Sequence, residues 1–221
     1  MKSNKDEFMK NIDKLEKAYF GEKIECIKIK NPVDKVYEEE IMKYLEAGEI
    51  NVKVVAWKNG SAKKIGDEYI PIVENGCYKN CQNNGIDKDH LECFLEEVQK
   101  RWKCIKNYDN FKEIYEMIIH CGVPANFGPV NIINLIFFLS KGNWPIYDRF
   151  ARIAVEAIYK GIEPYEVKYE ELPDKKEIER VRAQYSGYRW YLEQLFGKKE
   201  IDRKTDRALW VYGHMKKDED C

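Results

Sequence analysis

The sequence predicts a mainly α-helical fold, on three observations. Apolar residues recur at spacings of three and four along most of the chain, which is typical of one buried helix face. Glycine and proline tend to lie between these periodic segments, as at Gly142, Gly161, Pro164 and Gly197. The main departure is the stretch 59–88, which is rich in Gly, Asn and Gln and predicts loops.

The N-terminal part predicts two helices. The first covers 4–20, where Phe8, Ile12, Leu15 and Tyr19 share a face. The segment "ECIKIKN" at 25–31 is expected to be a short extended piece. A second helix starts near Pro32 and stops at Gly48. The Val-rich segment "INVKVVAW" fits either a strand or a buried helical turn.

The stretch 59–88 is expected to form an irregular or β-hairpin insert. It marks the boundary between an N-terminal lobe and a helical remainder, so 1–221 is predicted to be a single domain with two lobes. The remainder predicts six helices, at 89–104, 109–121, 129–140, 147–160, 174–196 and 201–217.

Charge and composition exclude some classes of protein. The 221 residues hold 38 Lys and Arg against 39 Asp and Glu, a net charge of -1. A wholly basic nucleic-acid coat is therefore excluded, while a local basic face remains open.

The first 20 residues lack the apolar core of a signal peptide, and "VNIINLIFFL" is too short to cross a bilayer. A cytoplasmic protein without membrane contact is expected.

The cysteines and histidines offer two weaker candidate sites. Seven cysteines at irregular spacings predict reduced thiols. Cys77, Cys81, His90 and Cys93 could together hold zinc, but the spacing is looser than a two-residue knuckle. The neighbours His120 and Cys121 would point about 100° apart on a helix, which disfavours a catalytic pair. We therefore expect no metal and no cofactor.

The segment "GVPANFGPVNIINL" carries the clearest chemical pattern. A turn containing Gly128 opens an apolar helix, and such a turn presents backbone N–H groups that can hold a phosphate. Asp148 follows Gly128 by 20 residues and starts the next apolar helix, where the helix dipole favours its ionised form.

This pair of features resembles the core of the helix-hairpin-helix DNA glycosylase superfamily, the group related to endonuclease III. "VPANFGPVN" takes the place of the hairpin and "PIYDRFARIA" that of the motif with the invariant Asp, within a core at 122–160. The resemblance implies a two-lobed helical fold and a DNA partner. It also implies that Asp148 is the catalytic carboxylate. The implied phosphate-binding turn consists of Asn126, Phe127, Gly128 and Pro129.

The departures from the family pattern narrow the implied chemistry. The nucleophilic Lys of bifunctional members falls on Val130, which excludes Schiff-base chemistry there. Only Cys221 follows Asp148, so no iron–sulfur cluster is implied. A monofunctional N-glycosylase remains, in which the carboxylate stabilises the oxocarbenium-like sugar and positions water.

The remaining site residues follow from the same resemblance. Trp57, Trp144 and Tyr147 would stack on the extruded base. Arg149 and Arg152 would contact phosphate. Motifs at 56–58, 75–78, 145–151 and 212–214 also resemble those of uncharacterised bacterial proteins, a group that implies a fold without an activity.

Plainer interpretations stand beside these. Asp148 could serve as an N-cap, the turn as an ordinary connection and the aromatic residues as core. Lys58 could be a nucleophile displaced from the family position, but its plainer interpretation is a solvated lysine at the end of a helix. The basic and aromatic segment 180–217 fits a nucleic-acid face or a solvated helix surface. The alternative function is a non-catalytic helical protein that binds nucleic acid or a protein partner.

Overall fold

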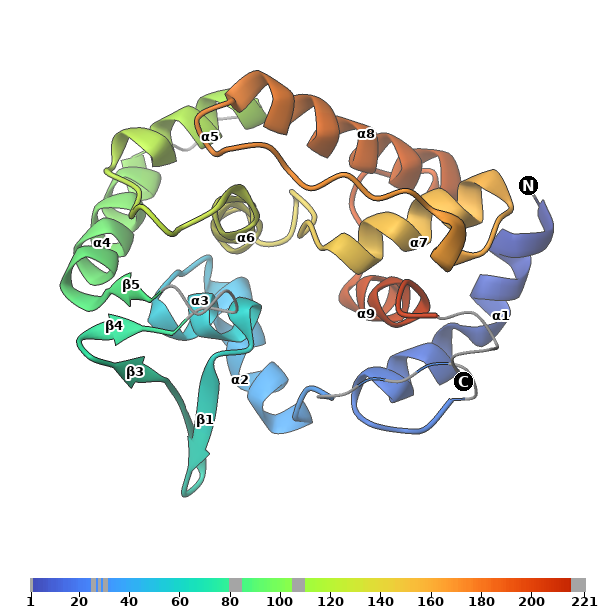
Figure 1. Cartoon of the computed structure of the whole chain (residues 1–221), viewed down its shortest axis with the longest axis horizontal. Coiled ribbons are helices and arrows are strands. Elements are labelled where there is room, and N and C mark those ends of the chain that lie inside the picture. The colour runs from blue at the N-terminus through green and yellow to red at the C-terminus, as the bar shows by residue number, and fades with distance from the viewer. Residues whose placement is uncertain are drawn as a thin grey trace. The chain divides into compact units, whose positions relative to one another are not determined.

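A computed structural model describes residues 2–24, 27, 29, 32–79, 85–104 and 110–215. It confirms a mainly helical fold with small antiparallel strand pairs (Figure 1). The helices are α1 Lys2–Tyr19, α2 Lys35–Ala47, α3 Val52–Asn59, α4 Lys88–Cys104, α5 Phe111–His120, α6 Pro129–Leu139, α7 Arg149–Lys160, the 3-10 turn η1 Pro164–Glu166, α8 Ile178–Phe196 and α9 Arg203–Tyr212. The strands are β1 Ala62–Ile65, β2 Glu68–Pro71, β3 Val73–Glu74, β4 Cys77–Tyr78 and β5 Ile86–Asp87.

The ambiguous Val-rich segment is helical. Asn51 caps α3, since its side chain accepts hydrogen bonds from the backbone N–H groups of Lys53 and Val54. Gly60, in the left-handed conformation with φ 59°, ends the helix. Most of the extended piece expected at 25–31 lies outside the described residues.

Two predicted helix boundaries in the C-terminal part are wrong. The helix expected from 174 begins at Ile178, because Asp174 instead makes a turn whose carboxylate accepts from the N–H of Lys176. The helix expected to reach 217 ends at Tyr212, where Gly213 follows as its C-cap.

The chain divides into two compact units, which are described separately. The first unit takes its described residues from 1–36, 147–171 and 183–221. In it, α9 packs against both α1 and α7 and lies between them in Figure 1. Phe8 of α1 contributes to this core, with its ring 5.8 Å from that of Tyr212 in an edge-on contact.

The second unit comprises 37–146 and 172–182 and is built around α6. All nine residues from Asn131 to Leu139 are buried, and the helix contacts α3 and α5. The apolar run "VNIINLIFFL" is therefore a core helix of this unit. Among the described residues, no helix combines the length and apolar character needed to cross a membrane.

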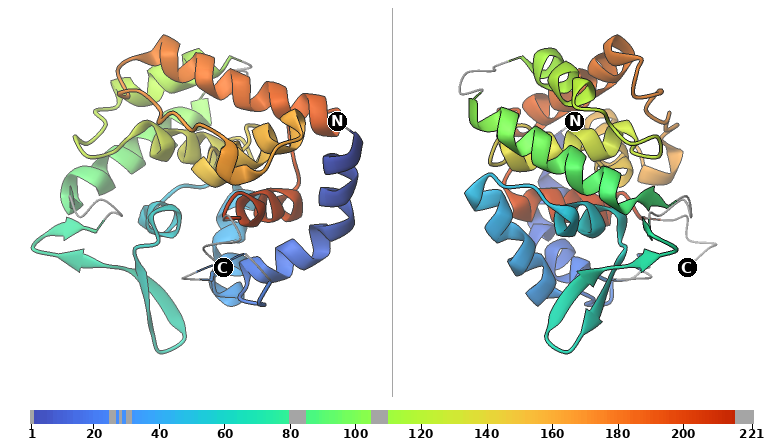
Figure 2. Two further views of the ribbon diagram at one scale, coloured as in Figure 1. Left: turned by 45° about the vertical axis from the view of Figure 1, so that its right-hand side comes forward. Right: turned by 90° about the vertical axis from the view of Figure 1, so that its left-hand side faces the viewer.

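The stretch 59–88 forms the strands of the second unit. β1 and β2 pair as a hairpin in which Ala62 faces Pro71, and β3, β4 and β5 form a separate antiparallel sheet. Figure 2 shows the tip of the β1–β2 hairpin extending beyond α3 and α4. Its base is anchored by Tyr69, whose ring stacks on that of Tyr37 at 4.2 Å.

Candidate functional site

Asp148 lies in the first unit, at the start of α7. It is the N-cap residue of this helix, and its Oδ1 accepts a hydrogen bond of 2.9 Å from the N–H of Phe150. The residue is half-buried. The cap orients the carboxylate and places it at the positive end of the helix dipole.

The end of α9 packs directly on this carboxylate-bearing turn. The ring of His214 stacks on that of Phe150 with 3.4 Å between centroids. Its Nδ1 lies 2.8 Å from the carbonyl oxygen of Trp210 and so carries the proton, since a carbonyl can only accept. Burial lowers the pKa of His214, while the nearby Asp148 charge acts in the opposite direction. The imidazole of His214 therefore lies close enough to the Asp148 carboxylate for that charge to affect its pKa.

Gly213 makes this contact between α7 and α9 possible. A Cβ atom at this position would lie 2.0 Å from the carbonyl oxygen of Phe150 and 2.6 Å from its carbonyl carbon. No other residue type could occupy the position without moving backbone. The motifs at 145–151 and 212–214 are thus in direct contact.

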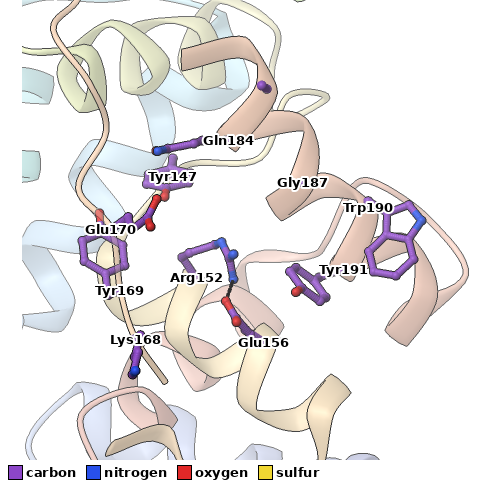
Figure 3. Close-up of a pocket in the computed structure, with 11 residues that line it drawn as sticks. Tyr147, Arg152, Glu156, Lys168, Tyr169, Glu170, Gln184, Gly187, Trp190 and Tyr191 are labelled. Atoms are coloured by element: carbon purple, nitrogen blue, oxygen red, sulfur yellow. Dashed lines mark hydrogen bonds and ion pairs between the residues drawn. The ribbon is translucent and has the colours of Figure 1, made fainter. Parts of the chain in front are cut away.

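A cavity of about 570 Å³ lies in the same unit. Its walls come from α7, from the segment before residue 171 and from α8 (Figure 3). The lining residues are Tyr147, Arg152, Glu156, Lys168, Tyr169, Glu170, Ala183, Gln184, Gly187, Trp190 and Tyr191. The volume falls within the range of small-molecule sites, about 300–1,000 Å³.

An ion pair and an aromatic ring form one wall of the cavity. Arg152 Nη1 donates to Glu156 Oε2 at 2.5 Å, and Lys160 Nζ donates to the other carboxylate oxygen at 2.5 Å. Burial acts to raise the pKa of Glu156, but the two cations outweigh it and hold that pKa below its ordinary value. The guanidinium of Arg152 also lies over the Tyr191 ring, 4.8 Å from its centroid.

Tyr147 links the cavity to Asp148. Its side chain is only 1% exposed, and burial raises the pKa of its hydroxyl above the ordinary range. The hydroxyl donates a hydrogen bond to that of Tyr169, which also lines the cavity. The Asp148 charge also raises the pKa of Tyr147 and Tyr169, so the carboxylate lies close to both, although it is not itself a lining residue.

The predicted turn at 126–129 lies in the second unit. Phe127 is fully buried, and its N–H donates to the carbonyl of Pro124 at 3.0 Å. The Asn126 side chain donates to the carbonyl of Gly85 at 3.0 Å. Gly128 is the N-cap of α6 and Pro129 its first residue.

Lys175 supports the same turn from the segment 172–182. Its Nζ donates to the carbonyl oxygens of Pro124 at 2.6 Å and of Ala125 at 2.8 Å. Burial lowers the pKa of this lysine. The ammonium group therefore bridges two carbonyls of the turn.

The predicted aromatic residues fall in different units. Tyr147 lines the cavity of the first unit. Trp57 and Trp144 belong to the second unit: the indole N–H of Trp57 donates to Glu38 Oε2 at 2.8 Å, and the Trp144 ring lies 5.7 Å from that of Phe111. Lys58 is half-buried in the last turn of α3.

The two predicted arginines both lie on α7. Arg149 is exposed, and its guanidinium lies 5.2 Å from the centroid of the Tyr169 ring. Arg152 is half-buried in the cavity wall. The α8 lining residues were missed by the sequence analysis, although Gln184, Gly187 and Tyr191 share the spacing of one helix face.

The cysteines show no assembled metal site in the part of the chain that the structure describes, where no three His, Cys, Asp or Glu side chains cluster. Cys81, one of the four considered zinc ligands, lies outside that part. Cys77 and Cys93 are free thiols, and His90 Nε2 lies 3.0 Å from the carbonyl of Gly122.

The side chains of His120 and Cys121 each contact the backbone of their own helix. His120 Nδ1 lies 2.6 Å from the carbonyl of Glu116, and the Cys121 thiol donates to that of Met117. Burial raises the pKa of Cys121, which favours the unreactive thiol over the thiolate.

Much of the positive charge in the segment 180–217 is neutralised locally. The ion pairs are Arg180–Glu177, Arg182–Glu179, Lys199–Glu193, Arg203–Asp206, Lys204–Asp13 and Arg207–Glu16. Each of these six cations therefore has a carboxylate partner in the part of the segment that the structure describes.

No family model, no curated protein and no solved structure matches this chain.

Proposed function

We propose that this chain is a DNA-binding protein of the base-excision type, with the helix-hairpin-helix glycosylase fold. In this proposal it hydrolyses the N-glycosidic bond of a flipped base, and Asp148 is the catalytic carboxylate. The observation that carries the proposal is the aromatic-lined cavity, whose lining residue Tyr147 immediately precedes Asp148.

The cavity would receive the extruded base. Enzymes that act on a base remove it from the helical stack and hold it between aromatic or apolar side chains, with hydrogen bonds to its edge. Here Tyr169, Trp190 and Tyr191 supply aromatic surface. Base–aromatic stacking contributes about 1–3 kcal/mol per base, which would help to offset the cost of unstacking.

Asp148 would act on the sugar of the same nucleotide. As the bond between C1′ and the base nitrogen breaks, its electron pair leaves with the base and positive charge develops on the sugar. A carboxylate at a helix N-terminus stabilises that charge, and it orients the water whose oxygen bonds to C1′. That water loses one proton as the new bond forms, and the departing base nitrogen gains one, so the products are the free base and a sugar hydroxyl. Since Val130 carries no amine, water is the nucleophile and the strand stays intact. Arg149 and the 126–129 turn would contact backbone phosphates.

Asp148→Asn separates the catalytic role of this residue from its structural one. Asn caps helices about as well as Asp, so the variant keeps the hydrogen bond to the Phe150 N–H and loses only the charge. The assay incubates both proteins with duplexes that each carry one damaged or mismatched base, and measures free base by chromatography. We expect release from at least one duplex and a loss of about 100-fold or more in the variant. Equal rates would remove Asp148 from the mechanism.

The second candidate is a non-catalytic protein that binds nucleic acid or a protein partner. It is favoured by the capping role of Asp148 and by the local pairing of so many cations. Salt-dependent binding of a labelled duplex without base release from any substrate would support the nucleic-acid form of this candidate. Neither binding nor release would point to a protein partner.

A further inference from the structure

Arg152 presents a hydrogen-bonding edge inside the cavity that its ion pair does not use. A guanidinium carries five N–H donors in one plane. The structure pairs Nη1 with Glu156, and among the residues that it describes it gives Nε and Nη2 no hydrogen bond. Nε–H and the neighbouring N–H of Nη2 are parallel in any guanidinium, so together they form a two-donor fork.

An occupant of the cavity can reach this fork. The Arg152 side chain is 21% exposed, and neither Nε nor Nη2 is shut off from solvent, in contrast to Nε of Arg189. Figure 3 shows the side chain extending from α7 between Tyr169 and Tyr191. The fork therefore belongs to the accessible surface of the cavity.

The fork is also held in place before an occupant arrives. Nη1 donates to Glu156 at 2.5 Å, and the guanidinium lies 4.8 Å from the centroid of the Tyr191 ring. A planar group fixed by two contacts loses little freedom on binding. Gly187 leaves room at the α8 wall, since a Cβ atom there would meet nothing within 4 Å.

The fork fits an edge that carries two adjacent acceptors. Carboxylates and phosphates have such an edge, and so does a 6-oxopurine, whose O6 and N7 lie side by side and are commonly read by arginine. The rings of Tyr169, Trp190 and Tyr191 favour the flat purine over a small anion. Adenine has N7 but carries an amine at C6, and that donor faces the fork unfavourably.

The spacing along α7 favours the far edge of the base. Arg152 follows Asp148 by one helical turn, a rise of about 6 Å. With the sugar at Asp148, the fork meets the part of the base that is remote from the glycosidic bond. O6 and N7 of a purine lie there, whereas the adjacent acceptors of cytosine begin with O2, beside that bond.

We propose that the cavity selects a 6-oxopurine, of the hypoxanthine or guanine type, whose O6 and N7 accept hydrogen bonds from the Arg152 fork. This inference rests on the proposed function, because it names the base that the cavity would accept.

Free nucleosides test the inference without DNA. Dissociation constants of the full chain are measured by calorimetry or ligand-observed NMR for inosine and three analogues. Adenosine carries an amine in place of O6, 7-deazainosine carries C–H in place of N7, and cytidine has its adjacent acceptors beside the glycosidic bond. We expect inosine to bind about tenfold or more tightly than each analogue, because none of them offers the far two-acceptor edge. Equal affinities would overturn the inference.

Arg152→Lys identifies the group that reads the edge. Lysine keeps the charge but has no planar fork, so the preference for inosine over adenosine should fall to about twofold or less. Lys160 still pairs with Glu156 in this variant, so the carboxylate keeps a partner, and unfolding curves establish that the chain is folded.

Arg207→Lys is the matched control. Arg207 is also largely buried and paired with a carboxylate, that of Glu16, but it lies on α9 and does not line the cavity. This variant should keep the full preference for inosine. A preference that survives in Arg152→Lys, or that is lost in both variants, would contradict the assignment to Arg152.

Three outcomes separate this inference from the proposed function. Inosine that does not bind at about 10 mM, or that inorganic phosphate displaces at equal concentration, would overturn the inference, the second by assigning the fork to an anion. Release of some other base from DNA without a preference for inosine would reject the inference and leave the hydrolase in place. A clear inosine preference without base release from any duplex would reject the hydrolase and leave the cavity assignment in place.

Discussion

Replacing Gly213 or Gly187 with alanine should change stability in opposite directions. Both glycines have helical or near-helical backbone, and the φ of Gly213 is -66°, so alanine meets no backbone penalty at either position. Only the space beside the added methyl group differs. A Cβ at Gly213 would lie 2.0 Å from the Phe150 carbonyl oxygen, whereas one at Gly187 would meet nothing within 4 Å.

The expected magnitudes follow from these distances. An ordinary carbon–oxygen contact is about 3.3 Å, so Gly213→Ala must move the end of α9 from the start of α7 by about 1.3 Å. All three nearest atoms belong to the Phe150 backbone and cannot rotate away. Overpacking typically costs about 1–3 kcal/mol, and we expect about 3 kcal/mol here. Gly187→Ala should stabilise the protein by up to about 1 kcal/mol through helix propensity.

The assay is thermal and urea unfolding followed by circular dichroism. For a chain of this length the midpoint shifts by about 2–4 °C per kcal/mol, so Gly213→Ala should lower Tm by about 6–12 °C and Gly187→Ala should raise it by about 2–4 °C. An unchanged Tm for Gly213→Ala would refute the close contact between α7 and α9. A clear loss of stability for Gly187→Ala would mean that the space beside α8 is occupied by protein.

Three further predictions concern the cap, the turn and the histidine. Asp148→Ala should destabilise the protein by about 1 kcal/mol in urea unfolding and Asp148→Asn by much less, so equal losses would argue against the cap. Lys175→Met should cost about 1–2 kcal/mol, because two carbonyls of the turn lose a charged donor. Faster backbone hydrogen exchange at the turn would locate the effect, and unchanged exchange would contradict it. Burial lowers the pKa of His214 in the folded chain below its ordinary 6.5. As the pH drops below that value, the unfolded chain takes up the proton before the folded chain does, so the free energy of unfolding falls. His214→Phe, which keeps a ring on Phe150, should lose less unfolding free energy than the parent between pH 7 and pH 5, and an identical loss would contradict this.

Much of the local structure could be predicted from the sequence because local rules govern it. The helix at 129–139 follows from Gly128 and Pro129 at its start and from a continuous apolar run. Asp148 caps its helix through a contact to the N–H of Phe150, two residues along the chain. Where such local signals conflict, as in "INVKVVAW", periodicity alone did not distinguish strand from helix.

The cavity could not be predicted in the same way, because it depends on faces brought together from distant parts of the chain. Trp57 and Tyr147 were both expected to contact the base, and nothing in their local sequence separates them. In the structure Tyr147 lines the cavity, whereas Trp57 packs in the second unit with its N–H on Glu38. The partner of an aromatic side chain is set by tertiary packing, which local spacing does not record.

By itself, the sequence determined the helical class, the positions of most helices and the prominence of Asp148, since periodicity and capping act between near neighbours. Only the tertiary structure decided what the glycines do. Gly213 allows two helices to touch, and Gly187 leaves a cavity wall open, although both are the same residue in helical surroundings. The difference lies in what faces each missing side chain, and that is a property of the folded chain.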